Sequence, residues 1–370
     1  MWNSDRFSSY RGQQRADGEW HPGGVAGQRL KDLTRRGKRR RWRERRLEAE
    51  AIRQAYERLK RVDAKYGALA ERMSTCGNIH WFDVARNDVG VEISRLSKTI
   101  SCNCRNCPQC QARKAYSLGG QLVEAVQEMI KRVPGCRAIF LTLTAINALQ
   151  GALEAELDRQ SEAFTRMTRW VRFGRSVLGG MRRFEITWNA IARSWHVHIH
   201  AWLFVPHDYG RKGSGLFIQQ VEWRQLWQKA LGVDYLPNVW VTSVRGVGDH
   251  GPNLGKAGRK AVAEMAKYAT KPGDMIDFDA NSGEYVCDET LLCELHDALE
   301  GRRMFAFFGQ LKDIRADLNE DGDEAVERPK FPPGFVHVCT EVYAWYWAPV
   351  RSQSDYFCID RQYVVRDPPF

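Results

Sequence analysis

Three histidines, His196, His198 and His200, alternate with apolar residues in residues 195–205, and this stretch ends almost wholly apolar. Such alternation predicts a β-strand that is buried at its far end. Because side chains two positions apart in a strand point to one face, we expect the three imidazoles to lie side by side. Imidazoles on a rigid strand are common ligands of divalent metals. A core strand with incidental histidines is the alternative, but three of the chain's nine histidines on one face favour a metal site.

A second group of potential metal ligands is a cluster of cysteines in residues 73–115. The cluster consists of Cys76, Cys102, Cys104, Cys107 and Cys110, half of the ten cysteines in the chain. Structural zinc takes four ligands, often from C-x-x-C pairs such as Cys107 and Cys110. Buried free cysteines are the alternative, and a redox pair would need a thioredoxin-like context that the sequence lacks. We therefore predict a Cys-rich zinc-binding segment, and the spacing leaves open which four cysteines bind.

The N-terminal region is basic, as is the chain as a whole, with a net charge of +11 and a pI near 9.2. This balance points to a nucleic-acid partner. Residues 1–34 have no apolar period and are expected to form a disordered arm. Residues 35–72 read as a basic helical DNA-binding segment whose arginines would contact phosphate with a salt-dependent gain. A solvated charged face is the alternative. The arginines in question are Arg35, Arg36, Arg39, Arg40 and Arg41.

The elements around the histidines predict an α+β fold, in which an antiparallel sheet has helices packed on it. The expected strands are residues 138–144, 182–188, 195–205 and 239–244, and the expected helices are residues 152–175, 217–231 and 259–270. Their order is β-α-β-β-α-β-α, with a hairpin between the second and third strands. This is the order of a split βαβ, RRM-like sheet. The basic helical arm and the Cys-rich segment precede it.

The last of these helices would carry Glu264 and Tyr268 on one face, because they are four residues apart, and Lys271 follows. Alone, this pattern is also that of an ordinary amphipathic helix. Residues 251–257 lack the spacing and the hydroxyl residue of a phosphate-binding loop, which argues against an ATPase. The chain has no apolar run long enough to span a bilayer, and its N-terminus lacks the apolar core of a signal peptide, so we expect a cytoplasmic protein.

Taken in order, three stretches resemble the replication initiators of rolling-circle plasmids, within the HUH endonuclease superfamily. Residues 140–144 are similar to the family's first motif, residues 195–205 to its His-x-His strand, and residues 264–271 to its catalytic helix. The cysteine cluster also fits, as do Arg302 and Arg303 before an aromatic strand. The combination is more specific than any single motif.

The resemblance covers roughly residues 40–310 and implies both a domain plan and an activity. Residues 116–275 would form an HUH nicking-joining domain, and residues 276–370 a C-terminal extension. Such an enzyme nicks one DNA strand at a plasmid origin. Tyr268 matches the nucleophile that stays joined to the 5′ end. Glu264 matches the carboxylate that, in the Tyr-Glu subgroup, activates water for termination.

The resemblance also implies the remaining site residues. His198 and His200 match the ligands of a catalytic Mg²⁺ or Mn²⁺, and Glu185 on the neighbouring strand is the expected third ligand. Lys271 would offset charge on the attacked phosphate, although a solvated lysine is the alternative. Arg302 and Arg303 are expected to contact DNA.

The expected partners are the plasmid origin, as a single-stranded nick site with flanking duplex, and a host helicase and DNA polymerase. A mobilisation relaxase or transposase of the same superfamily is one alternative. The Glu264–Tyr268 pair and the cysteine cluster favour replication over both. A non-catalytic zinc-containing DNA-binding repressor is the alternative from another class. It would explain the charge and the cysteines but not the histidines and the tyrosine in this order.

Overall fold

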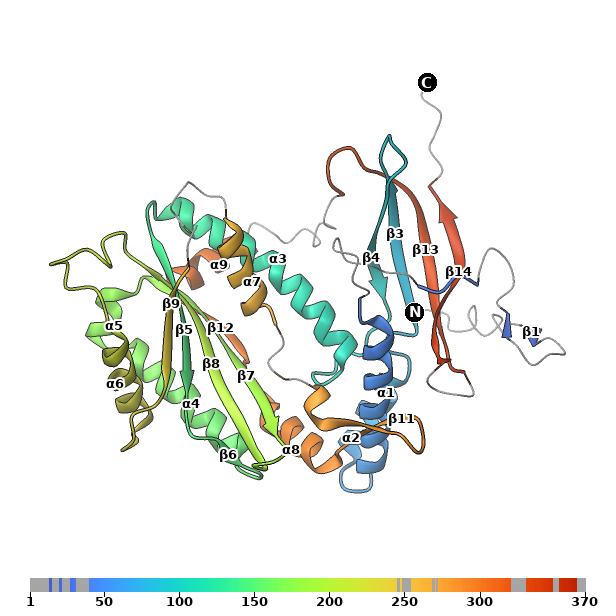
Figure 1. Cartoon of the computed structure of the whole chain (residues 1–370), viewed down its shortest axis with the longest axis horizontal. Coiled ribbons are helices and arrows are strands. Elements are labelled where there is room, and N and C mark those ends of the chain that lie inside the picture. Colours follow the sequence, from blue (N-terminus) through green and yellow to red (C-terminus); the bar gives the residue numbers. More distant parts are fainter. Residues whose placement is uncertain are drawn as a thin grey trace. The chain divides into compact units, whose positions relative to one another are not determined.

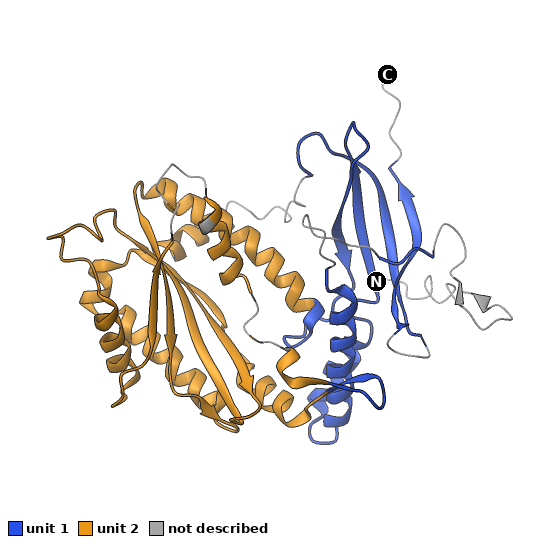
Figure 2. Ribbon diagram, in the orientation of Figure 1, with its two compact units in different colours: residues 1–109, 278–286, 326–370 blue, residues 110–277, 287–325 orange. Residues whose placement is uncertain are grey.

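The structure is a computed structural model, shown in Figure 1. It describes residues 13–14, 20–21, 27–30, 40–244, 247, 254–267, 270, 272–320, 331–348 and 353–364. The chain forms two compact units, coloured separately in Figure 2. Unit 1 comprises residues 1–109, 278–286 and 326–370, and unit 2 comprises residues 110–277 and 287–325. Among the described helices, none is both long and apolar enough to cross a membrane.

Unit 1 is built on a four-stranded antiparallel sheet in the order β14-β13-β3-β4. Its elements are α1 (Trp42–Leu59), α2 (Ala64–Ser74), β3 (Ile79–Arg86), β4 (Glu92–Thr99), β13 (Val336–Tyr346) and β14 (Asp355–Tyr363). Trp42 of α1 packs against Phe82 of β3 and Tyr356 of β14 in an aromatic core. Residues 27–30, which fall in the segment expected to be disordered, are hydrogen-bonded to β14.

Two short strand pairs lie outside this sheet. They are β1 (Gln13–Gln14) with β2 (Trp20–His21), and β10 (Ile276–Asp279) with β11 (Glu284–Cys287). The 3-10 helix η2 (Pro272–Met275) leads into β10.

Unit 2 is built on a six-stranded antiparallel sheet in the order β12-β7-β8-β5-β9, with β6 paired to β8. Its strands are β5 (Arg137–Thr144), β6 (Ala148–Leu149), β7 (Gly179–Asn189), β8 (Ser194–Val205), β9 (Val239–Ser243) and β12 (Phe305–Gly309). Its helices are α3 (Pro108–Arg132), α4 (Leu153–Thr168), α5 (Val171–Ser176), α6 (Gln220–Leu231), α7 (Lys256–Met265), α8 (Glu289–Leu299) and α9 (Gln310–Glu320). Only the first two residues of α3 belong to unit 1.

The topology of unit 2 confirms the predicted α+β fold. Along the chain, β5, α4, β7, β8, α6 and β9 form a βαββαβ unit. In the sheet, β8 lies between β5 and β7, so the two strands that a helix connects are not adjacent. This is the split βαβ arrangement. The backbones of β7 and β8 approach so closely that glycine is required at one position: a Cβ on Gly180 would lie only 2.2 Å from the carbonyl oxygen of Trp202. At the edge of the sheet, β12 pairs with the same end of β7.

The strand β8 explains how the sheet positions its histidines. Its odd-numbered residues are buried on one face. On the other face, Trp202 and Phe204 belong to a core cluster with residues of α3, α7 and α9. His196, His198 and His200 share this second face, nearer the start of the strand. The apolar end of β8 therefore anchors α7 on the same face that carries the imidazoles.

Two helices differ from the prediction. The helix expected over residues 152–175 is broken into α4 and α5, because Trp170 is extended with ψ 141°. In α5, Phe173 is buried and Val171 is exposed. The helix expected over residues 259–270 ends at Met265. Residue 270 is not helical, because Thr270 forms a parallel β-bridge with Ile186 of β7, which requires an extended chain.

Candidate functional site

A group of metal-ligating side chains lies on one face of the unit 2 sheet. In the register of β7 and β8, Glu185 is opposite His198 and Arg183 is opposite His200. The Oε2 atom of Glu185 lies 2.7 Å from Nε2 of His200. Glu185, His198 and His200 each offer a ligand atom within 4.8 Å of the others. The structure therefore brings the three predicted ligands together, and their nitrogen and oxygen donors suit a divalent cation.

Neighbouring side chains orient the histidines. Thr142 of β5 is opposite His200 on the other side, and its Oγ1 lies 3.1 Å from Nδ1 of that ring. This contact leaves Nε2 of His200 directed at Glu185. Partners of this kind fix the ring orientation and tautomer of a ligating histidine. His196 lies behind the group, with its Nε2 2.8 Å from Nε2 of His198. Burial lowers the pKa of His196 while Glu185 opposes that shift, and a lowered pKa favours neutral imidazole.

Arg183 is a member of this site that the sequence analysis missed. Its side chain is only 2% exposed, and its Nη2 lies 3.1 Å from Oε2 of Glu185 and 3.5 Å from Oε1 of Glu264. Burial lowers the pKa of Arg183, while the two carboxylates oppose that shift. The signal was present in the sequence, because Arg183 precedes Glu185 by two residues and so shares its face.

The segment expected to carry the nucleophile begins at α7. Glu264 lies in the last turn of α7, and Nζ of Lys267 is 2.5 Å from its Oε2. Tyr268 and Lys271 lie outside the described residues. Thr270 is held by its bridge to Ile186 and by a hydrogen bond of 2.8 Å from Nε2 of Gln111 to its Oγ1. The described residues before and after Tyr268 therefore both contact β7, Glu264 through Arg183 and Thr270 through Ile186.

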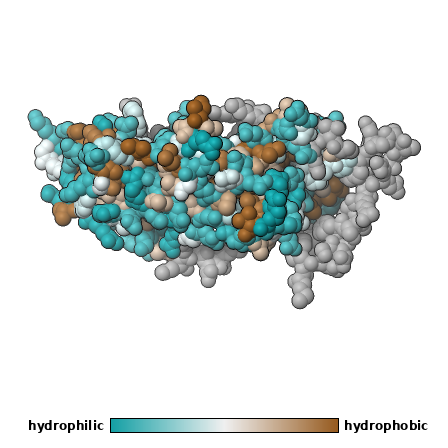
Figure 3. All heavy atoms as spheres, turned by 90° about the horizontal axis from the view of Figure 1, so that it is seen from below, coloured by the Kyte–Doolittle hydropathy of each residue, from teal (hydrophilic) through white to brown (hydrophobic). Residues whose placement is uncertain are grey.

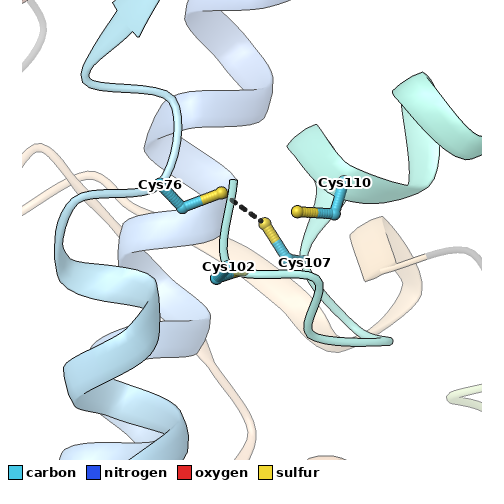
Figure 4. A group of neighbouring side chains, drawn as sticks. All are labelled: Cys76, Cys102, Cys107 and Cys110. Carbon is cyan, nitrogen blue, oxygen red and sulfur yellow. Dashed lines mark hydrogen bonds between the residues drawn. The ribbon is translucent and has the colours of Figure 1, made fainter. Parts of the chain in front are cut away.

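Four of the five predicted cysteines form a second group of ligands. Cys76, Cys102, Cys107 and Cys110 are all buried, and their sulfur atoms lie within 4.8 Å of one another (Figure 4). The sulfurs of Cys76 and Cys107 are 3.5 Å apart. Zn–S bonds of 2.3 Å in a tetrahedral site place sulfurs about 3.8 Å apart. The spacing therefore fits a four-coordinate metal.

The fifth cysteine, Cys104, makes backbone hydrogen bonds that stabilise the loop carrying this group. Its carbonyl accepts a hydrogen bond from the amide of Cys107, and its own amide donates to the sulfur of Cys102 at 3.4 Å. Its thiol is directed at the carbonyl oxygen of Cys102. Gln109 fixes the turn further, because its Nε2 donates to the carbonyl of Trp42 and to the hydroxyl of Tyr356.

The predicted DNA-binding arginines occupy different settings. Arg35, Arg36 and Arg39 lie outside the described residues. Arg41 is largely exposed and pairs with Glu48 at 2.7 Å, while Arg40 is half-buried. Arg302 pairs with Asp158 and with Glu154, and Arg303 is exposed. One face of the molecule is mostly hydrophilic, with apolar atoms in small separate groups (Figure 3).

Comparison with known proteins identifies the family. A family model described as "Replication protein" matches residues 93–353. A protein rep from Lactiplantibacillus plantarum is 35% identical over 299 residues, which cover 80% of this chain and 88% of that protein. A protein rep from Bacillus amyloliquefaciens is 32% identical over 334 residues, covering 86% and 95%. A third, from Streptococcus pneumoniae serotype 2, is 31% identical over 298 residues, covering 80% and 86%.

The chain therefore belongs to the replication protein family, which confirms the resemblance to rolling-circle plasmid initiators. No solved structure matches the chain significantly.

Proposed function

We propose that this protein nicks one strand at a plasmid origin and rejoins it, and so starts and ends rolling-circle replication. The observation that carries the proposal is the convergence of Glu185, His198 and His200 on one sheet face, in a member of the replication protein family. A relaxase or transposase would use a similar site, but the family match favours replication. A repressor would have no use for this group.

The residues of the site have separate roles in this proposal. Glu185, His198 and His200 would hold Mg²⁺ or Mn²⁺, which would orient the scissile phosphate and stabilise the charge that develops on it. Thr142 keeps the ring of His200 in the ligating orientation. The basic arm, from Arg35 to Arg41, would hold the flanking duplex through its phosphates.

Tyr268 supplies the nucleophile in the nicking step. Its phenol oxygen attacks the phosphorus, the bond from phosphorus to the 3′ oxygen breaks, and a phosphotyrosyl bond to the 5′ end forms. The phenol proton leaves the site and the departing 3′ oxygen gains one, so the products include a free 3′-OH that primes synthesis. A tyrosine has an ordinary pKa of about 10, so the reaction needs activation of this hydroxyl or of the phosphate. Lys271 would offset charge on the attacked phosphate.

Glu264 acts in termination, at the end of one round of replication. As a general base it takes a proton from water, whose oxygen attacks the phosphorus of the regenerated nick site. The bond to the 3′ oxygen breaks, and the resulting 3′-OH attacks the phosphotyrosyl bond to close the circle and release Tyr268. A carboxylate cannot form the second lasting linkage that another tyrosine would form, so the protein acts for one round.

The cysteine group has a structural role in this proposal. Cys76, Cys102, Cys107 and Cys110 would bind Zn²⁺, because four buried thiols leave no position for a substrate. The proposed partners are origin DNA and, since the sequence of residues 251–257 lacks the spacing of a phosphate-binding loop, a host helicase and DNA polymerase. Replication of a plasmid together with these host proteins would take place in the cytoplasm.

The proposal is tested with a labelled origin strand and Mn²⁺. The unaltered protein should cleave the strand and form a covalent adduct, and Tyr268→Phe should do neither. A shifted band without cleavage would instead support the repressor.

Replication in cells tests the role of Glu264. Glu264→Ala should nick and form the adduct but fail to terminate, so that plasmid multimers and long single strands accumulate. Normal unit-length circles from Glu264→Ala would mean that Glu264 serves only its ion pairs with Lys267 and Arg183.

A further inference from the structure

We propose that Arg183 is a positioning residue that ties Glu264 on α7 to Glu185 on β7, and so holds the termination carboxylate beside the metal-binding group. This inference rests on the proposed function of Glu264 and of the histidine group. Its evidence is a buried guanidinium whose Nη2 lies within 3.5 Å of carboxylates from two elements that are far apart in the sequence.

The burial of Arg183 makes this contact obligatory. A guanidinium that is only 2% exposed has lost most of its hydration, and such a charge is retained only when it is paired. Glu185 of β7 and Glu264 of α7 both pair with its Nη2 atom. Because Arg183 is directly opposite His200 in the sheet, the ion pair lies next to the ligating ring.

Glu264 depends on Arg183 for its direction. The apolar contacts of Val262 and Met265 hold α7 on the sheet, but they do not select a rotamer for a glutamate in the last helical turn. Its second partner, Lys267, is 59% exposed, and exposed ion pairs contribute little. The contact with the buried Arg183 is the one that directs Glu264 toward the histidine face.

The consequence concerns where hydrolysis takes place. If Glu264 is held beside Glu185, the water that it deprotonates attacks the same phosphate position that the metal group holds during nicking. Initiation and termination would then share one phosphate site. Arg183 touches Glu185 as well, so it also orients a metal ligand, and loss of such a partner typically lowers metal affinity by about 10- to 100-fold.

The test compares Arg183→Gln with Lys267→Gln, which removes the other partner of Glu264. Manganese binding to the whole protein is measured by electron paramagnetic resonance, and nicking and termination are measured separately. Arg183→Gln should bind Mn²⁺ about 10- to 100-fold more weakly. Saturating Mn²⁺ should restore its nicking of an origin oligonucleotide but not its termination. Lys267→Gln should match the unaltered protein, and Arg183→Gln with Glu264→Ala should terminate no worse than Glu264→Ala alone.

Arg183→Lys provides the test if Arg183→Gln does not fold. It keeps the charge but has a shorter reach and a single nitrogen, so it should fold and show the termination defect in a weaker form. Arg183→Lys indistinguishable from the unaltered protein, or a folded Arg183→Gln with normal Mn²⁺ affinity and normal termination, would overturn the proposal.

Failure of the inference is distinguishable from failure of the proposed function. If the unaltered protein does not nick, the proposed function is wrong, and the Mn²⁺ titrations still test the tie to Glu185. If Glu264→Ala terminates normally, the proposed role of Glu264 and this inference are both wrong, while the proposed nicking activity is unaffected. If Glu264→Ala is defective and Arg183→Gln is normal, the inference alone is wrong.

Discussion

The cysteine group and the histidine group differ in how completely they would surround a bound metal ion. The cysteine group offers four soft donors, all buried, and their number and spacing suit a tetrahedral site. The histidine group has three donors, all half-buried, on a sheet face, and leaves coordination positions for a substrate. In the proposed function, the difference teaches that the enclosed cysteine group stabilises the fold, whereas the open histidine group leaves room for the scissile phosphate.

The two groups also differ in what positions them. Turns and backbone hydrogen bonds set the cysteines, such as that from the amide of Cys107 to the carbonyl of Cys104. Strand register sets the histidine group, because Thr142, His200 and Arg183 are cross-strand neighbours on three strands. A single substitution should therefore affect folding at the first group and chemistry at the second.

The largest effect is expected from Cys107→Ser. Structural zinc contributes on the order of 10–16 kcal/mol of apparent binding free energy, and the loss of one thiolate forfeits much of it. The purified variant should lose its zinc and unfold far more easily, as metal analysis and thermal unfolding would show. Cys104→Ser is the matched control and should keep both. Equal zinc content and equal stability in the two variants would remove the distinction between Cys104 and the other four.

A loss of activity without loss of fold is expected from His200→Ala. Removal of one ligand should reduce nicking in Mn²⁺ by at least about 100-fold, because the metal term is worth several kcal/mol. Binding to duplex origin should remain. His196→Ala, which lies behind the group, should reduce nicking by less than about tenfold. Full cleavage by His200→Ala and by His198→Ala would show that this face is not a metal site.

A moderate effect, on the pH dependence of the free energy of unfolding, is expected from His80 of unit 1, which lies outside the histidine group. Complete burial, with a smaller contribution from Arg46, lowers the pKa of His80 from 6.5 to about 3. The folded protein therefore keeps His80 neutral, while the unfolded chain takes up a proton below pH 6.5. The contribution of neutral His80 to the free energy of unfolding is complete above about pH 6.5. It falls as the pH decreases toward 3, by at most about 1.4 kcal/mol per pH unit.

The measurement is urea unfolding of the whole protein between pH 7.5 and pH 5, compared with His80→Gln. The amide can keep a hydrogen bond to Thr99, whose hydroxyl lies 2.8 Å from Nδ1 of His80. The free-energy difference between the two proteins should shrink as the pH falls. A difference that is constant with pH would mean that His80 takes up a proton in the folded protein as readily as in the unfolded chain, so that burial does not lower its pKa.

The smallest effect concerns the basic arm. Replacing Arg35, Arg36 and Arg39 with Gln should reduce the salt dependence of origin binding, by a slope of roughly 0.9 for each lost duplex-phosphate contact. Arg302→Gln should change the slope less, because Arg302 must first leave Asp158 and Glu154. An unchanged slope in the arm variant would identify the arm as a solvated face.

The sheet of unit 2 and its ligands could be predicted because their signals are local. The alternation of residues 195–205 defines the histidine strand, and a hairpin brings Glu185 next to it. The sheet of unit 1 could not be predicted, because β3 pairs with β13, about 250 residues later.

Within the two candidate sites, the sequence could indicate which residues share a face of a strand, but not which residues contact each other. Its spacing treats five cysteines alike, whereas the structure directs the thiol of Cys104 at a backbone carbonyl. The spacing of two residues places Arg183 on the face of Glu185, but it does not show that the arginine has a second carboxylate partner. Its role appears only when α7 brings Glu264 to the same face.

The most direct test of the account is the identity of the residue that carries DNA after nicking. The unaltered protein is incubated with an origin strand and Mn²⁺, digested with nuclease and trypsin, and analysed by mass spectrometry. The account predicts a nucleotide adduct in the peptide that follows Lys267, with fragmentation placing it on Tyr268 and not on Tyr285, and no adduct in Tyr268→Phe. Cleavage without any adduct, or an adduct on another tyrosine, would contradict the assignment of Tyr268 as the nucleophile.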